Sequence, residues 1–225
     1  MKVSHIGFIL GLIGLTGAAP TFATTVSVCD GTAGNLIQNC GFESGGFLNW
    51  NSTGAASGSD FGVTTNIPNS GNDDARFGAV SGLPDFIDQS FSTVGGQSYT
   101  VSFYVDTAAN AGVYAGQFQA DWNGNQILLI TNPAAGHGSE TDSVAPISTD
   151  AAGYQLYSFT ETATGSSTDL KFGGFAGTSF YHLDDVVVTP NTSSVPEPSS
   201  VSFMLAGLIG IALAGRSYLR KRTNS

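Results

Sequence analysis

Polar and apolar residues alternate over several short runs in the middle of the chain, as in β-strands that bury one face. Between Gln97 and Val105 the apolar side chains of Tyr99, Val101 and Phe103 occupy every second position and Val105 completes the series. Residues two apart on a strand point to the same face of a sheet. We therefore expect these four side chains in the core.

The alternation returns in later segments that are separated by turn signals. The runs are 118–122, 126–130, 154–160, 170–175 and 182–189. Asn123-Gly124 joins the first two runs and is a strong signal for a two-residue hairpin turn. Strong helical periodicity is absent, and residues 132–152 are predicted to form a long loop. Strands at this spacing predict an all-β fold, a β-sandwich of the jelly-roll type.

The N-terminus has the layout of a secretory signal peptide. Lys2 and His5 precede an apolar stretch at 6–15, and Thr21-Phe22-Ala23 offers small residues at the usual cleavage positions. We expect cleavage after Ala23. An N-terminal membrane anchor is the alternative, but the apolar stretch is shorter than the roughly 20 residues that a spanning helix needs.

The C-terminus carries a second signal. Pro196-Glu197-Pro198 precedes an apolar run at 201–215, and the chain then closes with a basic cluster that includes Arg220-Lys221-Arg222. This order resembles the PEP-CTERM sorting signal of Gram-negative bacteria. The resemblance implies export, a C-terminal segment held in the inner membrane, and processing by an exosortase-type enzyme. The predicted division is a signal peptide at 1–23, a β-sandwich at 24–190, and a linker with the sorting and transmembrane tail at 191–225.

Charge is distributed unevenly along the chain. Of seven basic residues only Arg76 and Lys171 lie between 24 and 190, whereas all seventeen acidic residues lie between Asp30 and Glu197. Such a surface repels phosphates, so we expect no nucleic-acid partner. Dense carboxylates suit divalent cations, calcium above all. A solvated acidic surface without bound metal is the alternative.

The only two cysteines are Cys29 and Cys40. In an exported chain, two cysteines this close in sequence most often pair. The predicted disulfide would pin the N-terminal segment to the first strand region.

Several short motifs occur in an order that resembles a known family. Asn39-Cys40-Gly41-Phe42-Glu43 is followed by Trp50, and Leu183-Asp184-Asp185-Val186 lies near the end of the predicted domain. This set resembles the galactose-binding-like jelly rolls that include carbohydrate-binding modules of the CBM4/9 type. The resemblance implies a non-catalytic module that binds glycans or organises an exopolysaccharide or biofilm matrix, at the cell envelope or outside the cell. A purely structural surface protein without a saccharide site is the alternative, and a polysaccharide-acting enzyme is a weaker one.

The same resemblance implies a structural calcium ion between the first and last strands. Its ligands would be Glu43 and Asp184, with oxygens supplied near 70–74, including Asp74. The alternative is that these carboxylates only accept hydrogen bonds from loop amides. Successive residues on a strand point to opposite faces, so we expect only one of Asp184 and Asp185 to enter a given site.

Aromatic residues are the candidates for contact with a sugar. We expect Trp50 and Trp122 in the core, because large aromatic side chains dominate cores. Tyr114 and Tyr181 are the better surface candidates, since they lie near predicted loop edges.

No catalytic residue is predicted. His182 and Asp184 lie two apart and would share a strand face. No serine or cysteine can be tied to them by spacing, so the sequence does not indicate a catalytic triad.

Overall fold

The computed structural model describes the central part of the chain, comprising residues 26–54, 60–78, 83–106, 115–132, 141–150, 153–177 and 180–191. The predicted signal peptide, Tyr114 and the sorting motif Pro196-Glu197-Pro198 lie outside these residues. Among the helices in the described ranges, none has the length and apolar character needed to cross a membrane.

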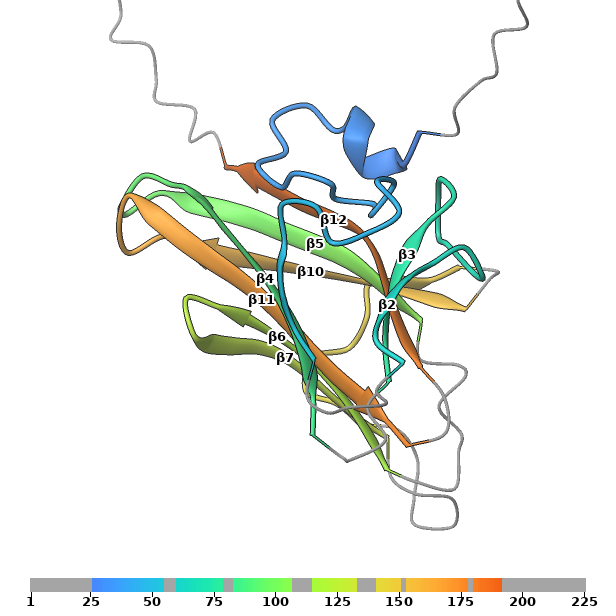
Figure 1. Ribbon diagram of the computed structural model, residues 1–225. Coiled ribbons are helices and arrows are strands. Elements are labelled where there is room, and N and C mark those ends of the chain that lie inside the picture. Colours follow the sequence, from blue (N-terminus) through green and yellow to red (C-terminus); the bar gives the residue numbers. More distant parts are fainter. Residues whose placement is uncertain are drawn as a thin grey trace, which may run out of the picture.

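Two antiparallel six-stranded sheets pack against each other, which confirms the predicted all-β sandwich (Figure 1). In spatial order, sheet A consists of β1 (Asn51–Thr53), β4 (Asp85–Ser92), β11 (Ser167–Ala176), β6 (Gly116–Trp122), β7 (Asn125–Asn132) and β8 (Thr141–Asp142). Sheet B consists of β2 (Gly62–Thr64), β3 (Asp74–Phe77), β12 (Tyr181–Pro190), β5 (Ser98–Asp106), β10 (Tyr154–Thr162) and β9 (Ser148–Thr149). The chain crosses repeatedly from one sheet to the other, as in a jelly roll.

The core lies between the sheets and is rich in aromatic rings. The alternating series in β5 faces inward as predicted, since Tyr99, Val101, Phe103 and Val105 are all at most 2% exposed. The ring of Phe103 meets that of Phe172 on β11 edge to face, with centroids 4.9 Å apart. This aromatic contact joins sheet B to sheet A.

Both tryptophans belong to the core, as expected. Trp50 is 5% exposed and Trp122 is 2% exposed. Each indole N–H donates to a backbone carbonyl, that of Trp50 to Asn39 O at 3.2 Å and that of Trp122 to Thr162 O at 3.4 Å. Neither ring is therefore available as a sugar platform.

The hairpin between β6 and β7 also forms where it was predicted. Asn123 and Gly124 have φ of 49° and 77°, the pair of positive values that a type I′ turn requires. The loop prediction for 132–152 is wrong in its described part. Residues 141–150 contain β8 and β9, each two residues long, which is too short for alternation to be visible in the sequence.

The N-terminal segment completes an edge of β12 that none of the described strands covers. β3 pairs with β12 only from Tyr181 to Leu183. Farther along β12, Leu36 N donates to Val188 O at 2.9 Å, and Val186 N donates to Cys40 O at 3.0 Å. Residues 35–40 thus take the place of an edge strand, which satisfies backbone groups that would otherwise stay unpaired.

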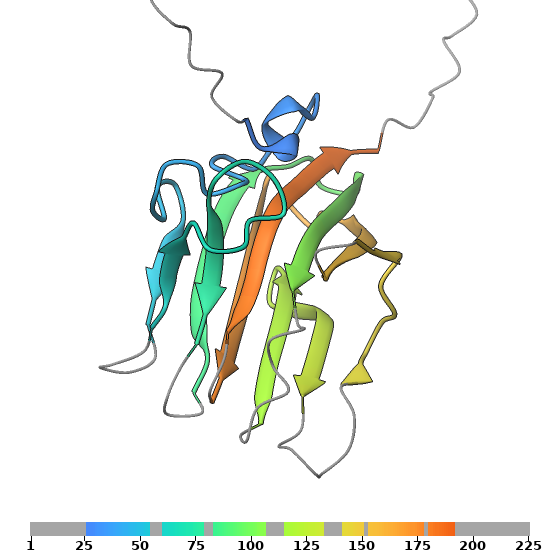
Figure 2. The ribbon, with the colours of Figure 1, turned by 90° about the vertical axis from the view of Figure 1, so that its right-hand side faces the viewer.

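Two further features hold this segment in place. The Asn35 side chain accepts from Val188 N at 2.9 Å and donates to Val186 O at 3.2 Å. The predicted disulfide between Cys29 and Cys40 is present, with an S–S distance of 2.02 Å. It ties the end of the covering segment to the short 3₁₀ helix η1 (Val28–Gly31). Figure 2 shows η1 above the end of β12, on the side where the described chain begins and ends.

Candidate functional site

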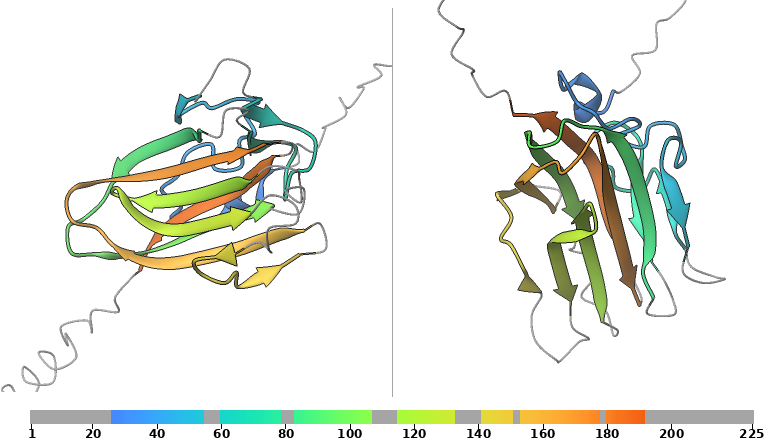
Figure 3. Two further views of the ribbon diagram at one scale, coloured as in Figure 1. Left: turned by 90° about the horizontal axis from the view of Figure 1, so that it is seen from below. Right: turned by 90° about the vertical axis from the view of Figure 1, so that its left-hand side faces the viewer.

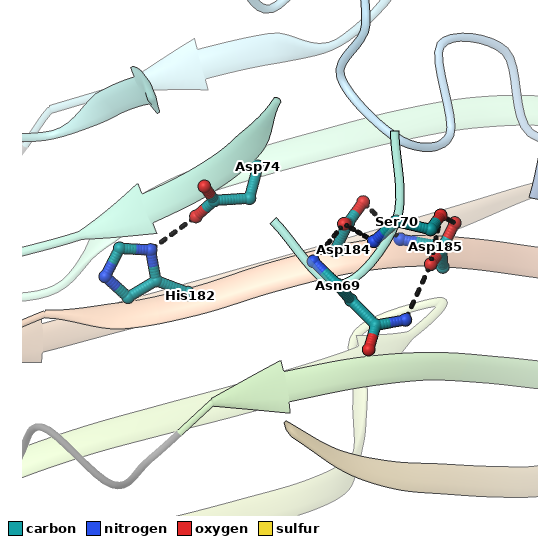
Figure 4. Close-up of polar contacts among 6 residues, drawn as sticks. All are labelled: Asn69, Ser70, Asp74, His182, Asp184 and Asp185. Atoms are coloured by element: carbon teal, nitrogen blue, oxygen red, sulfur yellow. Dashed lines mark hydrogen bonds and ion pairs between the residues drawn. The ribbon is translucent and has the colours of Figure 1, made fainter. Parts of the chain in front are cut away.

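A buried polar cluster joins β12 to the loop that precedes β3 (Figure 4). Asp184 Oδ2 accepts hydrogen bonds from Asn69 N at 2.8 Å and Ser70 N at 3.1 Å. Asp184 Oδ1 accepts from the backbone N–H of Asp185 at 2.7 Å. The fully buried carboxyl of Asp184 therefore holds the loop through its backbone.

The neighbouring carboxyl of Asp185 binds the same loop and the N-terminal segment. It accepts from Asn69 Nδ2 at 2.7 Å and from Ser70 Oγ at 2.8 Å. It also accepts from Ser27 Oγ at 2.5 Å and Cys29 N at 3.2 Å. Three chain segments that lie far apart in sequence meet at this one side chain.

The prediction that only one of these two carboxylates would enter a site is wrong. The register of β12 against β5 shifts between Asp184 and Val187, and Asp185 has a left-handed φ of 52°. This irregularity breaks the strict up–down alternation of a strand. Both carboxylates consequently bind residues of the same loop.

Glu43 holds the next part of this loop. Its carboxylate accepts from Asn72 N at 2.9 Å and Asp73 N at 3.2 Å. Gly71 lies between these contacts and the Asp184 contacts, with φ of 69°. A Cβ at this glycine would overlap the Glu43 carboxylate. Glu43 and Asp184 thus fix successive amides of one loop.

Asp74 belongs to a different arrangement, an ion pair with His182 Nδ1 (Figure 4). Both side chains are buried, and His182 shares a strand face with Asp184, as predicted. Asp74 Oδ1 has no hydrogen-bond partner among the described residues. The pair links β3 to β12 diagonally, because the residue of β3 directly opposite His182 is Arg76, two positions after Asp74.

Burial and mutual repulsion shift several pKa values in this cluster. Burial, followed by the charge of Asp185, raises the pKa of Asp184 to about 8. Burial and then the charge of Glu43 raise the pKa values of both Asp30 and Asp73. The carboxyl groups therefore repel one another across the N-terminal segment, the loop and β12.

The three predicted calcium ligands do not converge in this structure. Glu43 and Asp184 accept amide N–H groups, whereas Asp74 pairs with His182. Among the described residues, the only group of three or more potential ligand atoms within 4.8 Å of one another is Cys29, Asp30 and Cys40. Its two sulfurs form the disulfide and do not fit a metal. The geometry matches the amide-binding alternative at Glu43 and Asp184, and calcium stays a prediction.

Tyr181 does not reach the surface. Its side chain is fully buried, with its ring centroid 5.8 Å from that of Phe118. The prediction that it could contact a ligand is therefore wrong, because Tyr181 begins β12 on the side that faces the core rather than a loop edge.

A different surface combines aromatic and polar side chains, on the outer side of sheet A. Figure 3 shows β4, β11, β6 and β7 side by side, seen from below in the left view. Alternate residues of these strands fill the core, and the intervening ones point outward. We call eight of the outward residues, on β4, β6 and β11, the sheet A face: Phe86, Asp88, Gln117, Gln119, Asp121, Asp169, Lys171 and Phe175, all partly exposed.

The centre of the sheet A face is an aromatic ring lying over a glycine. Gly173 on β11 pairs with Phe86 on β4 and with Gln119 on β6. A Cβ at Gly173 would overlap the Phe86 ring, so only glycine allows the ring this position. Lys171 Nζ lies 4.0 Å from the ring centroid, a cation–π contact. Phe175, two residues beyond Gly173, adds a second ring beside Gln117.

Amide and carboxylate groups form a hydrogen-bonded line along β6. Gln117 Nε2 donates to Gln119 Oε1 at 3.2 Å, and Gln119 Nε2 donates to Asp121 Oδ2 at 2.9 Å. The line holds donors and acceptors in fixed positions next to the Phe86 ring. The alternation in β6 could have revealed these three outward positions. Alternation could not reveal Phe86 as an outward residue, because the apolar Ile87 follows it directly in the sequence.

Comparisons with known proteins found similarity in structure only. No protein-family model matches the chain, and no curated protein matches it by sequence. A family 61 carbohydrate-binding module solved with β-1,4-galactotriose is 13% identical, with a TM-score of 0.45, covering 70% of this chain and 99% of that one.

Two further solved structures show the same range of similarity. A family 22 xylan-binding domain from Paenibacillus barcinonensis is 16% identical, with a TM-score of 0.42, covering 67% of this chain and 90% of that one. The enzymatically active domain of tailspike protein 4 from bacteriophage CBA120 is 11% identical, with a TM-score of 0.47. The match covers 70% of this chain but spans only 22% of the tailspike domain.

Proposed function

We propose that this protein is an exported, non-catalytic β-sandwich module that binds glycans through the sheet A face. A sugar ring presents an apolar face and a rim of hydroxyl groups. Binding sites for such ligands combine apolar or aromatic surface with a few fixed polar groups. The observation that carries the proposal is the Phe86 ring over Gly173, flanked by the hydrogen-bonded line from Gln117 to Asp121.

The test is binding to a panel of soluble polysaccharides, measured by affinity electrophoresis and titration calorimetry. Replacing Phe86 by Ala removes the central ring from the outer surface without opening the core. We expect it to weaken binding roughly 5- to 150-fold, since stacking on one ring contributes on the order of 1–3 kcal/mol by analogy with bases stacked on aromatic side chains.

The matched control is Tyr104→Ala, which removes a partly exposed ring from the outer side of sheet B. Tyr104 lies opposite Asp184 and Leu156 in the register of sheet B. Circular dichroism confirms that each variant is folded. If both variants bind as the wild type does, the sheet A face is not the glycan site.

Export and sorting form the second part of the proposal. The signal-peptide layout at 1–23 and the Pro196-Glu197-Pro198 motif support secretion followed by exosortase-type processing, with the product at the envelope or in an exopolysaccharide matrix. A disulfide between Cys29 and Cys40 is compatible with an oxidising compartment. Mass spectrometry of the mature protein should find a C-terminus near Pro196 to Ser199. Intact Arg220-Lys221-Arg222 on surface protein would contradict processing.

Calcium is the third part, and the crowded carboxylates support it. Asp30 and Asp73 each have a pKa raised in part by Glu43, and a cation held beside Glu43 would relieve that repulsion. Glu43 is the predicted ligand that fits best, because it is only partly buried. Glu43 and Asp184 would both have to give up amide partners, and Asp74 would have to give up His182.

A further inference from the structure

We infer that the sheet A face selects glycans that carry free amino groups, such as de-N-acetylated hexosamine polymers, over glycans that carry carboxylates. The inference rests on the proposed glycan-binding function and names the class of ligand. It follows from the arrangement of charges around the Phe86 ring.

Negative and positive charges alternate along one row of residues that crosses three neighbouring strands of sheet A. Lys171 on β11 pairs with Asp88 on β4 on one side and with Asp121 on β6 on the other. Asp169 lies two residues before Lys171 on β11, at the neighbouring outward position, and its carboxylate accepts a hydrogen bond from Ser90 Oγ at 3.2 Å. Three carboxylates thus surround one lysine on a surface about three strands wide.

The lysine does not neutralise these carboxylates by direct contact. Lys171 forms no ion pair with a described carboxylate, and its ammonium lies over the Phe86 ring instead. Asp88 Oδ2 accepts from Asn51 Nδ2 at 2.8 Å, and Asp121 Oδ2 accepts from Gln119 Nε2 at 2.9 Å. The Oδ1 atom of each carboxylate has no donor among the described residues, so each can accept a bond from a ligand ammonium.

The contact at the Phe86 ring shows that the surface around it accommodates an ammonium group. A protein ammonium already lies 4.0 Å from the ring centroid, between two carboxylates in register. An ammonium group on a sugar bound beside Lys171 would meet three carboxylates against one lysine, so the net charge that it approaches is negative. A ligand carboxylate would instead approach Asp88 and Asp121, and like charges at such distances repel.

No other cation of the domain could receive an acidic sugar. Arg76 and Lys171 are the only basic residues between 24 and 190, and Arg76 pairs with Asp60 near sheet B. Burial and then the charge of Asp88 raise the pKa of Asp169, while Ser90 and Lys171 lower it, so Asp169 is repelled by the carboxylate on the neighbouring strand. Added negative charge would increase that repulsion, and added positive charge would relieve it.

The experiment measures binding of the full-length protein in detergent to three oligosaccharides of equal length: glucosamine, N-acetylglucosamine and galacturonate oligomers. The pH is chosen so that the amines are protonated. We expect the glucosamine oligomer to bind most tightly and the galacturonate oligomer least. An exposed ion pair changes affinity by up to about fivefold, so two carboxylates allow an advantage of about an order of magnitude that shrinks as salt rises.

The decisive variant is the double substitution Asp88→Asn and Asp121→Asn, which should abolish the preference. The readout is the ratio of the affinities for the glucosamine and N-acetylglucosamine oligomers, because Asp121 also belongs to the hydrogen-bonded line of the proposed binding site. The control Asp30→Asn with Glu161→Gln loses the same two charges from other parts of the molecule and should keep the preference. Equal loss in both double variants would overturn the inference, because attraction would then come from total charge alone.

The remaining outcomes separate the two proposals. Equal or tighter binding of the N-acetylated or the galacturonate oligomer overturns amino-group selection and leaves glycan binding standing. If the protein binds none of the three oligomers and none of the polysaccharides in the panel, both proposals are overturned. A glucosamine preference that disappears in Phe86→Ala supports both.

Discussion

At the scale of single residues, the loop before β3 shows how glycine and carboxylate positions depend on each other. Gly71 has a left-handed φ and leaves room for the Glu43 carboxylate, which accepts two successive amides beyond it. The loop therefore needs glycine at this position for two reasons, its backbone conformation and the space beside it. The two reasons can be separated experimentally.

Replacing Gly71 by Ala should destabilise the fold by about 2 kcal/mol or more, because a positive φ costs about 1 kcal/mol and the displaced Glu43 loses hydrogen bonds of similar value. Gly34→Ala is the control, since Gly34 also has a positive φ, 78°, but nothing lies within 4 Å of its added Cβ. Urea denaturation of both variants measures the difference. Equal losses would show that Glu43 adjusts without cost.

Asp184 makes stability depend on pH in a direction unusual for an aspartate. Its pKa is about 8 in the folded protein against an ordinary value of 3.8, so between these pH values the folded state binds more protons than the unfolded chain. The free energy of unfolding should consequently fall as pH rises from about 4 to 8 and be lowest above pH 8.

Asp184→Asn should flatten that fall, because an amide cannot ionise, while its oxygen can still accept from Asn69 N and Ser70 N. Urea denaturation at pH 5 and pH 8.5 compares the two proteins. Asp169 and Glu161 also have raised pKa values and would leave a residual slope in both. A slope that is equal in wild type and variant would remove Asp184 as its source.

At the scale of elements, the N-terminal segment acts as the missing neighbour of β12. Its backbone bonds to Val186 and Val188 depend on Cys40 and Asn35 staying beside the strand. Disulfides that close short loops contribute about 2–3 kcal/mol in the chain-entropy model.

Reducing the disulfide, or replacing both Cys29 and Cys40 by Ser, should cost about 2–3 kcal/mol. It should also speed hydrogen exchange at the amides of Val186 and Val188, since their acceptors lie on the released segment. The amides between β5 and β10, at Phe103 and Tyr157, are the internal control and should keep their protection. Unchanged exchange at Val186 and Val188 would show that the segment stays docked without the disulfide.

The strands could be predicted from the sequence wherever one face of the strand is buried and the other is exposed to solvent. β5 and the β6–β7 hairpin are such cases, because alternation and an Asn-Gly turn leave a local record in the sequence. The bulge at Asp185 leaves none, since its cause is a set of partners at Ser27 and Asn69–Ser70 that lie far away in sequence. The same reason explains Tyr181, whose inward direction is set by pairing with Phe77 on β3.

At the scale of the whole molecule, the dominant property is negative charge. The described domain carries its carboxylates with only Arg76 and Lys171 to balance them. Carboxylate repulsion on this scale destabilises the compact state. A bound divalent ion would oppose that repulsion where the carboxylates are closest.

Calcium should raise the melting temperature by several degrees, and a chelator should reverse the rise. An ion that binds only the folded state adds about 2.7 kcal/mol at a hundred times its dissociation constant, and 1 kcal/mol shifts Tm by roughly 2–4 °C in a domain of this size. Glu43→Gln should abolish the response and Glu161→Gln should keep it. Melting curves that coincide with calcium and with chelator would exclude a structural ion.

Under the proposed secretion, the edge-covering role of residues 35–40 also has a consequence for the order in which the protein folds. A chain that crosses a membrane from its N-terminus presents Cys29 and Cys40 first, and they are only 11 residues apart. Their disulfide can close while most of the domain is still on the other side. The strand they serve, β12, is the last to emerge, about 150 positions later by the Asn35–Val186 contact. The disulfide of the N-terminal segment would therefore already be formed when β12 emerges and pairs with it.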